Sequence, residues 1–377
     1  MSTIHGLTMP KWGLSMTEGK IVAWLVDEGA EVIPGVELVE IETDKILGSL
    51  EAPVSGLLRR KVAKEGDVAP VAGLLGVIAD TAIPDSEIDL FIADFLARFA
   101  SAEAEAEASG PLPEVVLVQG QPCRYLKRGQ AGELAVLIHG FGGDLNTWLF
   151  NHEELSGSRA VYALDLPGHG GSSKQVGGGT LGEFANVLGD FMDALGLSKA
   201  HLVGHSMGGA VALQFALTHP ERARSLVLIA SAGLGVEIDG EFIEGFIAAS
   251  RRKEIKPHLE KLFADPKLVG HQLIEDVLKN KRLDGVEAAL RTVAGQFCPG
   301  GQQAVVLRDR LTRLSMPIMV IWGEEDRILP VSHAQGLPTI VRTEIFPECG
   351  HMVQMEAATK VNRLIYSLWE SANGARK

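Results

Sequence analysis

The sequence predicts a multidomain chain: a small all-β sandwich, followed by a larger α/β domain with a doubly wound, mostly parallel sheet and a helical lid. Three observations support this prediction. An internal repeat lies near the N-terminus, an acidic alanine-rich segment follows it, and strand and helix patterns then alternate. The chain has 377 residues, more than one ordinary hydrophobic core requires. We expect a first domain over residues 4–80, a linker with a short amphipathic helix over 81–111, and a second domain over 112–372 with its lid at about 233–313.

Composition and charge narrow the class of protein. Hydrophobic residues make up 46% and charged residues 22% of the chain, as in soluble globular proteins. The net charge of −13 argues against nucleic acid or an anionic membrane as a partner. The three cysteines form no C-x-x-C pair, which argues against a disulfide framework or a thiolate metal site. The sequence shows no signal-peptide pattern and no membrane-spanning apolar run, so we expect a cytoplasmic protein without a bound metal.

The repeat covers residues 7–80 and consists of two similar halves. Equivalent residues lie 37 positions apart: Gly19 and Gly56, Leu38 and Leu75, Ile41 and Ile78. Each half contains short apolar–polar alternations that end at glycine or proline, which is typical of β-strands and turns. Two equal β halves favour a sandwich with pseudo-two-fold symmetry. Lys45 follows the last strand of the first half, so we expect it at an exposed turn that joins the halves.

Several motifs surround this lysine in a fixed order: Met9-Pro10, Gly19-Lys20-Ile21-Val22, Glu28-Gly29, Glu42-Thr43-Asp44-Lys45, Glu51-Ala52-Pro53 and Glu65-Gly66-Asp67. Together they resemble the lipoyl domains of 2-oxo acid dehydrogenase complexes, and the segment Pro10–Gly19 is most similar to those of acetoin-cleaving systems. The resemblance implies the lipoyl/biotinyl-type fold and a covalent lipoate on Lys45. The alternatives are an unmodified surface lysine and a biotinylated one. Biotinyl domains usually place the lysine between methionines, whereas Asp44 and Ile46 flank it here.

Residues 81–111 differ in composition from both neighbouring segments. Apolar residues recur there at helical spacing: Ile88, Phe91, Ile92, Phe95, Leu96 and Phe99. We therefore expect an amphipathic helix over residues 86–99, for which Ser86 and Asp89 offer a capping box. The low-complexity, acidic stretch that follows predicts a flexible tether. The helix has two interpretations: it packs on its own neighbouring domain, or it docks a partner or a second copy of the chain.

The second domain shows the strand–helix alternation of a parallel sheet. The candidate buried strands are Leu134–Ile138, Ala160–Leu164, His201–Val203, Leu226–Ile229 and Ile318–Ile321. Charged helical sequence from about Gly233 to Arg313 interrupts the alternation. We interpret this segment as a helical lid inserted between two strands.

A G-x-S-x-G motif, Gly204-His205-Ser206-Met207-Gly208, lies between an apolar strand and a helical run. This context is that of a nucleophile elbow, in which glycines leave room for a sharp strand-to-helix turn. The turn would place the Ser206 hydroxyl at a helix N-terminus, where N–H groups favour a developing oxyanion. Ser206 is therefore the candidate nucleophile.

Two later segments supply a candidate acid and a candidate base. Asp326 follows an apolar strand, and His351 lies beyond the next strand. The order Ser206, Asp326, His351 resembles that of the α/β-hydrolase fold family, and the resemblance covers residues 112–370. It implies that His351 acts as general base and then general acid, and that Asp326 orients its imidazole. Glu325 is the alternative acid.

The loop that begins at His139 resembles the oxyanion loop of the same family. The resemblance implies an oxyanion hole formed by the backbone N–H groups of Phe141 and Met207. We expect a structural role for His139 and a packing or loop contact for His205, next to the nucleophile. His169 lies in a segment that turns the chain in this family, so we assign no chemistry to it.

The whole chain resembles the dihydrolipoyllysine-residue acetyltransferase component of acetoin dehydrogenase systems. That resemblance implies transfer of an acetyl group from the lipoyl-lysine arm to coenzyme A through an acyl-serine. It also implies two partners, a thiamine-diphosphate-dependent acetoin dehydrogenase component and dihydrolipoamide dehydrogenase. The chain departs from ordinary lipoyl acyltransferases, because it lacks their H-x-x-x-D-G motif and their basic subunit-binding module.

Two other functions are compatible with the same residues. One is a serine hydrolase, a thioesterase or esterase, fused to a lipoyl carrier domain. The other is a non-enzymatic carrier whose hydrolase-like domain only binds partners. The sequence contains no recognisable coenzyme A signature. The basic cluster Arg251–Lys253 in the expected lid is either a solvated helix face or a phosphate contact.

Overall fold

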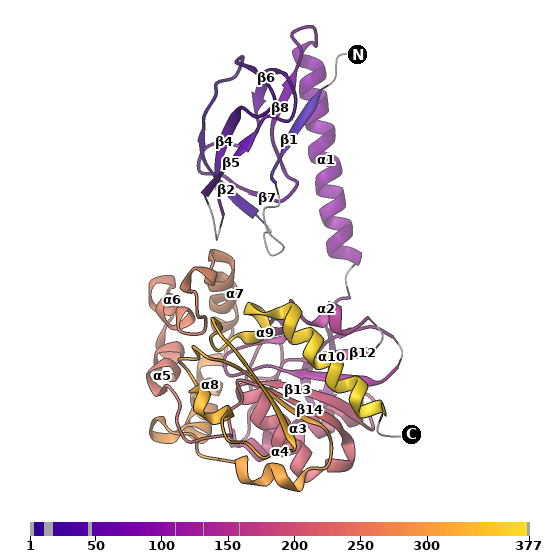
Figure 1. Cartoon of the computed structure of the whole chain (residues 1–377), viewed down its shortest axis with the longest axis vertical. Helices are drawn as coiled ribbons and strands as arrows, with labels where there is room; N and C mark the ends of the chain where they lie inside the picture. The colour runs from indigo at the N-terminus through magenta and orange to yellow at the C-terminus, as the bar shows by residue number, and fades with distance from the viewer. Residues whose placement is uncertain are drawn as a thin grey trace. The chain divides into compact units, whose positions relative to one another are not determined.

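The computed structural model describes residues 4–10, 18–43, 47–109, 111–130, 132–157 and 159–374. The chain separates into two compact units, Met1–Gly110 and Pro111–Lys377. Figure 1 shows a β sandwich with one long helix in the first unit, and a sheet flanked by helices in the second.

The first unit contains two four-stranded antiparallel sheets. One sheet has the order β1 (His5–Thr8), β8 (Leu74–Ala79), β6 (Gly56–Lys61), β3 (Glu31–Val32). The other has the order β5 (Leu47–Glu51), β4 (Glu37–Glu42), β2 (Glu18–Trp24), β7 (Val68–Pro70). Strands of both sheets supply the buried residues between them, as in a sandwich.

The sequence repeat maps onto this architecture. β4 begins at Glu37 and β8 at Leu74, which are 37 positions apart, and the two strands lie in different sheets. In the same way β2 corresponds to β6, and β3 to β7, so each sheet has the same order of equivalent strands. Repeated apolar residues such as Leu38 and Leu75 are fully buried. The predicted pseudo-two-fold sandwich is therefore present.

Lys45 itself lies outside the described residues. The strands on either side of it, β4 and β5, pair in antiparallel register with Glu42 opposite Leu47. The predicted lipoyl lysine is thus in the short connection between two hydrogen-bonded strands.

Helix α1 (Asp85–Ser109) packs on the first unit through its N-terminal turns. Ile88 is fully buried, and Phe91, Ile92 and Phe95 pack against residues of β8. Arg59 of β6 also forms an ion pair with Asp85 at 2.6 Å. These contacts support the first interpretation of the amphipathic stretch, which is packing on its own neighbouring domain.

The prediction of a short helix followed by a flexible tether is wrong in one respect. The α1 backbone continues through the alanine–glutamate stretch to Ser109, well beyond residue 99. Alanine and glutamate are among the best helix formers, so a helix already nucleated on the sandwich can propagate through them. Low complexity was a poor guide here because it ignores intrinsic helix propensity.

The second unit is built on an eight-stranded sheet with the order β16-β15-β14-β13-β11-β12-β10-β9. The strands are β9 (Glu114–Val118), β10 (Gln121–Arg128), β11 (Leu134–Ile138), β12 (Ala160–Leu164), β13 (Ala200–His205), β14 (Ala223–Ile229), β15 (Ile318–Gly323) and β16 (Val341–Phe346). In the order of the sheet, each of the six strands β16, β15, β14, β13, β11 and β12 is parallel to its neighbour. β10 and β9 then extend the sheet at one edge in antiparallel orientation.

Helices cover both faces of this sheet. Residues of α3 (Leu181–Ala194) and α4 (Met207–Thr218) join one hydrophobic cluster, and residues of α2 (His152–Leu155) and α10 (Ala358–Gly374) join the other. The segment between β14 and β15 forms four further helices: α5 (Gly240–Ala248), α6 (Arg252–Glu260), α7 (His271–Lys281) and α8 (Val286–Phe297). Figure 1 shows these four helices gathered at one side of the sheet. Within the described ranges, none of the helices is long and apolar enough to cross a membrane.

Candidate active site

Ser206 occupies the turn between β13 and α4. Its backbone has φ 53° and ψ −120°, a conformation that L-residues rarely adopt and that surrounding contacts must enforce. A Cβ atom on Gly204 would overlap the carbonyl of Gly208, and one on Gly208 would overlap the carbonyl of Ile138. The glycines of the motif are therefore required by close backbone packing.

Two backbone donors flank the serine. Met207 is the first residue of α4, so its N–H group has no partner within the helix. The N–H of Phe141 donates no hydrogen bond to any residue that the structure describes. A Cβ atom on Gly140 would lie 2.9 Å from the Cβ of Ser206, so the loop carrying Phe141 passes close to the serine. This arrangement suits an oxyanion hole, and the assignment of these two donors to it stays a prediction.

The loops after β15 and β16 bring Asp326 and His351 together. Nδ1 of His351 donates a hydrogen bond to Oδ2 of Asp326 at 2.8 Å, and both side chains are buried. Oδ1 of Asp326 accepts hydrogen bonds from the backbone N–H groups of Ile328 and Leu329 at 2.8 and 3.0 Å. Because the ionised carboxylate can only accept, Nδ1 of His351 carries the proton and Nε2 is left as a base.

Glu325, the alternative acid, is exposed to solvent. Its backbone N–H donates to the carbonyl of Cys349 at 2.9 Å, which turns the loop. The structure places the carboxylate of Asp326, and not that of Glu325, against the imidazole of His351.

A contact between His205 and His351 joins the serine turn to the histidine loop. Nε2 of His205 donates to the carbonyl oxygen of His351 at 3.0 Å, and the ring centroids are 4.8 Å apart. Burial holds the pKa of His205 well below its usual value, and the neighbouring His351 adds to this effect. The expectation that His205 makes a loop contact agrees with this geometry.

The third contact of the predicted triad is not formed. In the described part of the chain, the Ser206 hydroxyl has no hydrogen-bond partner. Catalytic hydrogen bonds are often long without substrate and shorten only in the reacting complex. The structure thus contains the His351–Asp326 pair beside the serine turn, and the role of Ser206, Asp326 and His351 as a triad stays a prediction.

Sequence analysis missed Glu356, which connects the histidine loop to the lid segment. Its two carboxylate oxygens accept hydrogen bonds from the N–H groups of Gly350 and Ala264, each at 2.8 Å. Burial raises the pKa of Glu356, and the two backbone donors oppose that shift. No spacing could have revealed this residue, because its partners are backbone groups distant in sequence.

Comparison with known proteins assigns both units to families. Residues 5–78 match the family described as "Biotin-requiring enzyme", and residues 135–358 match the family described as "alpha/beta hydrolase fold". One relative comes from Pseudomonas putida and is named the dihydrolipoyllysine-residue acetyltransferase component of the acetoin cleaving system. It is 50% identical to this chain over 364 residues, which cover 96% of this chain and 98% of that protein. The chain belongs to this family. The component of the same name from Cupriavidus necator is 44% identical over 363 residues and 96% of each chain.

These findings confirm the fold class and the resemblance inferred from the sequence. This member of the acetyltransferase-component family therefore combines a lipoyl-type sandwich with a domain of α/β-hydrolase fold. A meta-cleavage product hydrolase from Pseudomonas fluorescens has a similar structure, with a TM-score of 0.63 at 23% identity over 69% of this chain and 98% of that one. At that identity the likeness shows the fold alone.

The possible metal ligands and the three cysteines of the described residues can be located in the structure. No group of three or more His, Cys, Asp and Glu side chains is placed there to hold a metal ion. Burial raises the pKa of Cys123 to about 12 and those of Cys298 and Cys349 to about 11, so these buried thiols are protonated at neutral pH.

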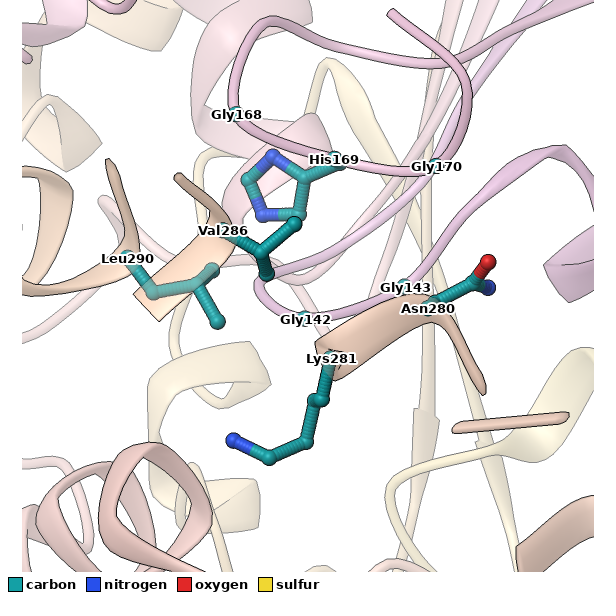
Figure 2. Close-up of a pocket in the computed structure, with 9 residues that line it drawn as sticks. All are labelled: Gly142, Gly143, Gly168, His169, Gly170, Asn280, Lys281, Val286 and Leu290. Carbon is teal, nitrogen blue, oxygen red and sulfur yellow. The ribbon is translucent and has the colours of Figure 1, made fainter. Parts of the chain in front are cut away.

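A pocket opens beside the loop that carries Phe141, and Figure 2 shows its walls. Two glycine-rich turns of the core, Gly142-Gly143 and Gly168–Gly170, form one side. The end of α7 and the start of α8 form the other, with Val286 and Leu290 presenting apolar side chains. The pocket therefore lies where the helical segment meets the predicted oxyanion loop.

The end of α7 is hydrogen-bonded to the core and to a second lid helix. Nδ2 of Asn280 donates to Oδ2 of Asp144 at 2.6 Å, three residues after Phe141. Nζ of Lys281 donates to the carbonyls of Phe246 and Ile247, in α5, at 2.6 and 3.1 Å. The pocket wall is thus fixed by direct hydrogen bonds.

Proposed function

We propose that the chain is an acyltransferase that moves an acetyl group from a lipoyl arm on Lys45 to coenzyme A, through an acetyl ester of Ser206. The observation that carries the proposal is the His351–Asp326 hydrogen bond beside a strained serine turn, on the same chain as a lipoyl-type sandwich. The names of the relatives at 50% and 44% identity support the reaction assigned.

The frame around Lys45 suits a lipoyl group. β4 and β5 pair with Glu42 opposite Leu47, so residues 43–46 join two strands that hydrogen bonds hold together. Lys45 offers the primary amine that an amide with lipoate requires. When bound, the lipoyl group supplies an acyl thioester at the end of a long flexible arm.

In the first half-reaction, Nε2 of His351 takes the proton of the Ser206 hydroxyl. The Ser206 oxygen attacks the thioester carbonyl, and the N–H groups of Phe141 and Met207 stabilise the oxyanion. His351 would then give its proton to the leaving sulfur as the carbon–sulfur bond breaks, and Ser206 would keep the acetyl group as an ester. Asp326 stabilises the imidazolium during this step through its hydrogen bond to Nδ1.

In the second half-reaction, His351 takes the proton of the coenzyme A thiol. The sulfur attacks the carbonyl of acetyl-Ser206, a new thioester forms, and the ester bond to Ser206 breaks. The proton returns from His351 to the serine oxygen, so the enzyme is regenerated. Each half-reaction exchanges one acyl bond for another and consumes no oxidant or reductant.

The alternative acceptor is water, which would make the protein a hydrolase. The same serine, histidine and aspartate serve both reactions, so the difference depends on what reaches the acyl-serine. The lid segment adds an apolar wall near the oxyanion loop, where Phe246 of α5 faces Phe141 with ring centroids 6.2 Å apart. An apolar wall at this position favours thiol transfer, because it keeps bulk water from the ester.

The proposed place in metabolism follows from the acetoin-cleaving relatives. A thiamine-diphosphate-dependent acetoin dehydrogenase component would load the arm on Lys45. Dihydrolipoamide dehydrogenase would reoxidise it after transfer. Binding of both purified components to the lipoylated chain tests this part of the proposal separately from the chemistry at Ser206.

The decisive experiment follows acetyl transfer from acetyl-dihydrolipoamide in the presence and absence of coenzyme A. We expect acetyl-CoA as the main product, and a loss of at least about 1,000-fold in the rate for Ser206→Ala. The exposed Ser332→Ala serves as the matched control and keeps the wild-type rate. Full acetyl-CoA formation by Ser206→Ala would overturn the mechanism, and acetate as the sole product would establish the hydrolase.

The lipoyl assignment has its own measurement. The intact mass of protein made in a lipoylating host should exceed the mass of the unmodified chain by one lipoyl group. Lys45→Arg should abolish this increment. An increment that persists in Lys45→Arg would place the modification elsewhere.

A further inference from the structure

The sheet of the second unit ends at β16, and one side of that strand has no neighbouring strand. β16 is the last strand in the order of the sheet and pairs with β15 alone. Two large apolar side chains are exposed at this edge, Ile345 in the strand and Ile340 just before it. An open strand edge is a template for pairing with another strand.

One hydrogen bond shows which backbone groups of β16 face the open edge. The carbonyl of Phe346 accepts from the N–H of Glu324 at 2.9 Å, so the backbone groups of Phe346 point to the β15 side. Successive residues of a strand alternate in this direction. Val341, Thr343 and Ile345 therefore direct their N–H and carbonyl groups to the open edge.

The side chains of β16 follow the same order of chemical types in both directions. Thr343 is at the centre, Arg342 and Glu344 lie on either side of it, and apolar residues lie beyond them, Ile340-Val341 before and Ile345-Phe346 after. Arg342 and Glu344 share one face of the strand and form an exposed ion pair at 2.9 Å. Such a strand is complementary to itself in antiparallel orientation, because reversing it exchanges the positive and negative positions.

Two copies of β16 aligned about Thr343 form a consistent ladder. The two threonines lie opposite each other, and each N–H donates to the other's carbonyl. Each Ile345 N–H reaches the partner's Val341 carbonyl, while the N–H of Val341 keeps its own bond to the carbonyl of Pro338 at 2.9 Å. In the same register, Arg342 of each copy faces the partner's Glu344.

We propose that the β16 edge binds a second copy of this chain, with the two strands antiparallel about Thr343. Reciprocal Arg342–Glu344 pairs and Val341–Ile345 contacts between the copies set the partner and the register. The net charge of −13 on each chain opposes association, but salt screens charges farther apart than about 8 Å, and these pairs are in direct contact. The inference does not depend on the chemistry at Ser206.

The opposite edge of the sheet lacks this complementarity. β9 also exposes apolar side chains, those of Val115 and Leu117, but Glu114 is its single charged residue. Self-pairing of β9 would therefore place no ion pair between the copies. The two edges predict different effects of charge reversal in β16.

Sedimentation velocity measures association of the full chain at about 50 μM, a concentration far above a micromolar dissociation constant. We expect a dimer. Arg342→Glu sets carboxylates against each other and Glu344→Arg sets guanidinium groups against each other, so each should raise the dissociation constant at least about tenfold. Arg291→Glu is the matched control: it reverses an exposed arginine that is also ion-paired within the chain at 2.9 Å, and it should leave the constant unchanged.

An equal mixture of the two variants gives the decisive result. The Arg342→Glu chain carries two carboxylates at the edge, and the Glu344→Arg chain carries two guanidinium groups. Antiparallel pairing sets these opposite charges face to face, so the mixture should form a heterodimer although neither variant pairs with itself. Simple damage to the fold, such as loss of the Arg342–Ser367 bond of 3.1 Å, would not be reversed by mixing.

A cysteine at the centre tests the register in an otherwise wild-type chain. In Thr343→Cys the two Cα atoms are expected at about 5.5 Å, within the range of a disulfide, so mild oxidation should link the copies. Ile345→Cys is the matched control, because its two copies are separated by four residues, or about 13 Å, along the strands. The native cysteines are buried and do not compete.

Three results would overturn the inference: a monomeric chain at the highest concentration, a mixture of the two variants that stays monomeric, or a disulfide in Ile345→Cys but not in Thr343→Cys. A dimer that resists both charge reversals also overturns it and would direct attention to another surface, such as β9. Because the cysteine test leaves both charges in place, it decides the question even if a charge-reversed strand does not fold.

Discussion

The hydrogen bond between Asp326 and His351 makes Asp326→Asn the sharpest test of the proposed chemistry. Two backbone N–H groups, of Ile328 and Leu329, hold one carboxylate oxygen at 2.8 and 3.0 Å. An asparagine at this position must keep its amide oxygen there, or two buried donors lose their acceptor. Its NH₂ group then faces Nδ1 of His351.

This geometry reverses the tautomer of the imidazole. An NH₂ group can only donate, so Nδ1 of His351 must accept and the ring proton moves to Nε2. Protonated Nε2 cannot take the proton of Ser206. Removing the aspartate charge from a Ser-His-Asp triad in this way costs about 10,000-fold in kcat, which corresponds to about 5 kcal/mol of transition-state stabilisation.

Acetyl transfer to coenzyme A at pH 7.5 measures this loss, and a fluorophosphonate probe measures the reactivity of Ser206 directly. Thermal unfolding of the same samples shows whether the variant is folded. The neighbouring Glu325→Gln removes the same charge from an exposed side chain and should retain activity within about twofold. If Asp326→Asn kept more than a tenth of wild-type kcat, the assignment of Asp326 as the orienting acid would be wrong.

Three further changes test other parts of the structure. Ile88→Ala removes a fully buried side chain of α1 and should lower the free energy of unfolding of the first unit by about 2–4 kcal/mol. In the same urea titration, Leu90→Ala changes an exposed side chain and should alter the free energy of unfolding by less than about 0.5 kcal/mol. If Ile88→Ala and Leu90→Ala lowered the stability equally, the packing of α1 on the sandwich would be contradicted. Glu356→Gln places an amide NH₂ group against a buried N–H group, and the two donors repel each other. Calorimetry should show a free energy of unfolding lower by about 1–3 kcal/mol, and initial rates should show a lower kcat. A wild-type Tm and kcat would mean that Glu356 does not support the histidine loop. Burial lowers the pKa of His152 from 6.5 to about 4, so the folded state binds a proton at His152 less readily than the unfolded state does. The contribution of neutral His152 to the free energy of unfolding is therefore full above pH 6.5 and is lost as the pH falls toward 4. His152→Gln should therefore flatten the change in urea midpoint between pH 7 and pH 4.5, and an unchanged slope would contradict the shift.

The parts of the fold that follow from periodic patterns could be predicted from the sequence. The 37-residue repeat fixed the equivalence of β4 and β8, because a repeated strand pattern must bury the same face twice. The glycine spacing around Ser206 identified the serine turn, because no other residue fits against the carbonyls packed there. In both cases the constraint is local in sequence and acts through backbone geometry.

Features that depend on contacts between distant backbone groups could not be predicted. Glu356 connects Gly350 to Ala264, and neither partner contributes a side chain to the contact. The length of α1 was misjudged for a different reason, because composition was given more weight than helix propensity.

The serine, histidine and aspartate are common to transfer and hydrolysis, so acceptor choice must depend on residues outside them. Among the described residues, the corner between α7 and α8 is hydrogen-bonded to the predicted oxyanion loop through Asn280. Asn280 reaches Asp144 at 2.6 Å, and the next residue, Lys281, holds the carbonyl of Phe246, whose ring faces Phe141. A displacement of α7 that breaks the Asn280–Asp144 bond is expected to loosen the loop that carries Phe141, a predicted oxyanion donor. On the proposed function, we therefore expect acceptor choice to depend on this corner of the lid segment as well as on the three predicted triad residues.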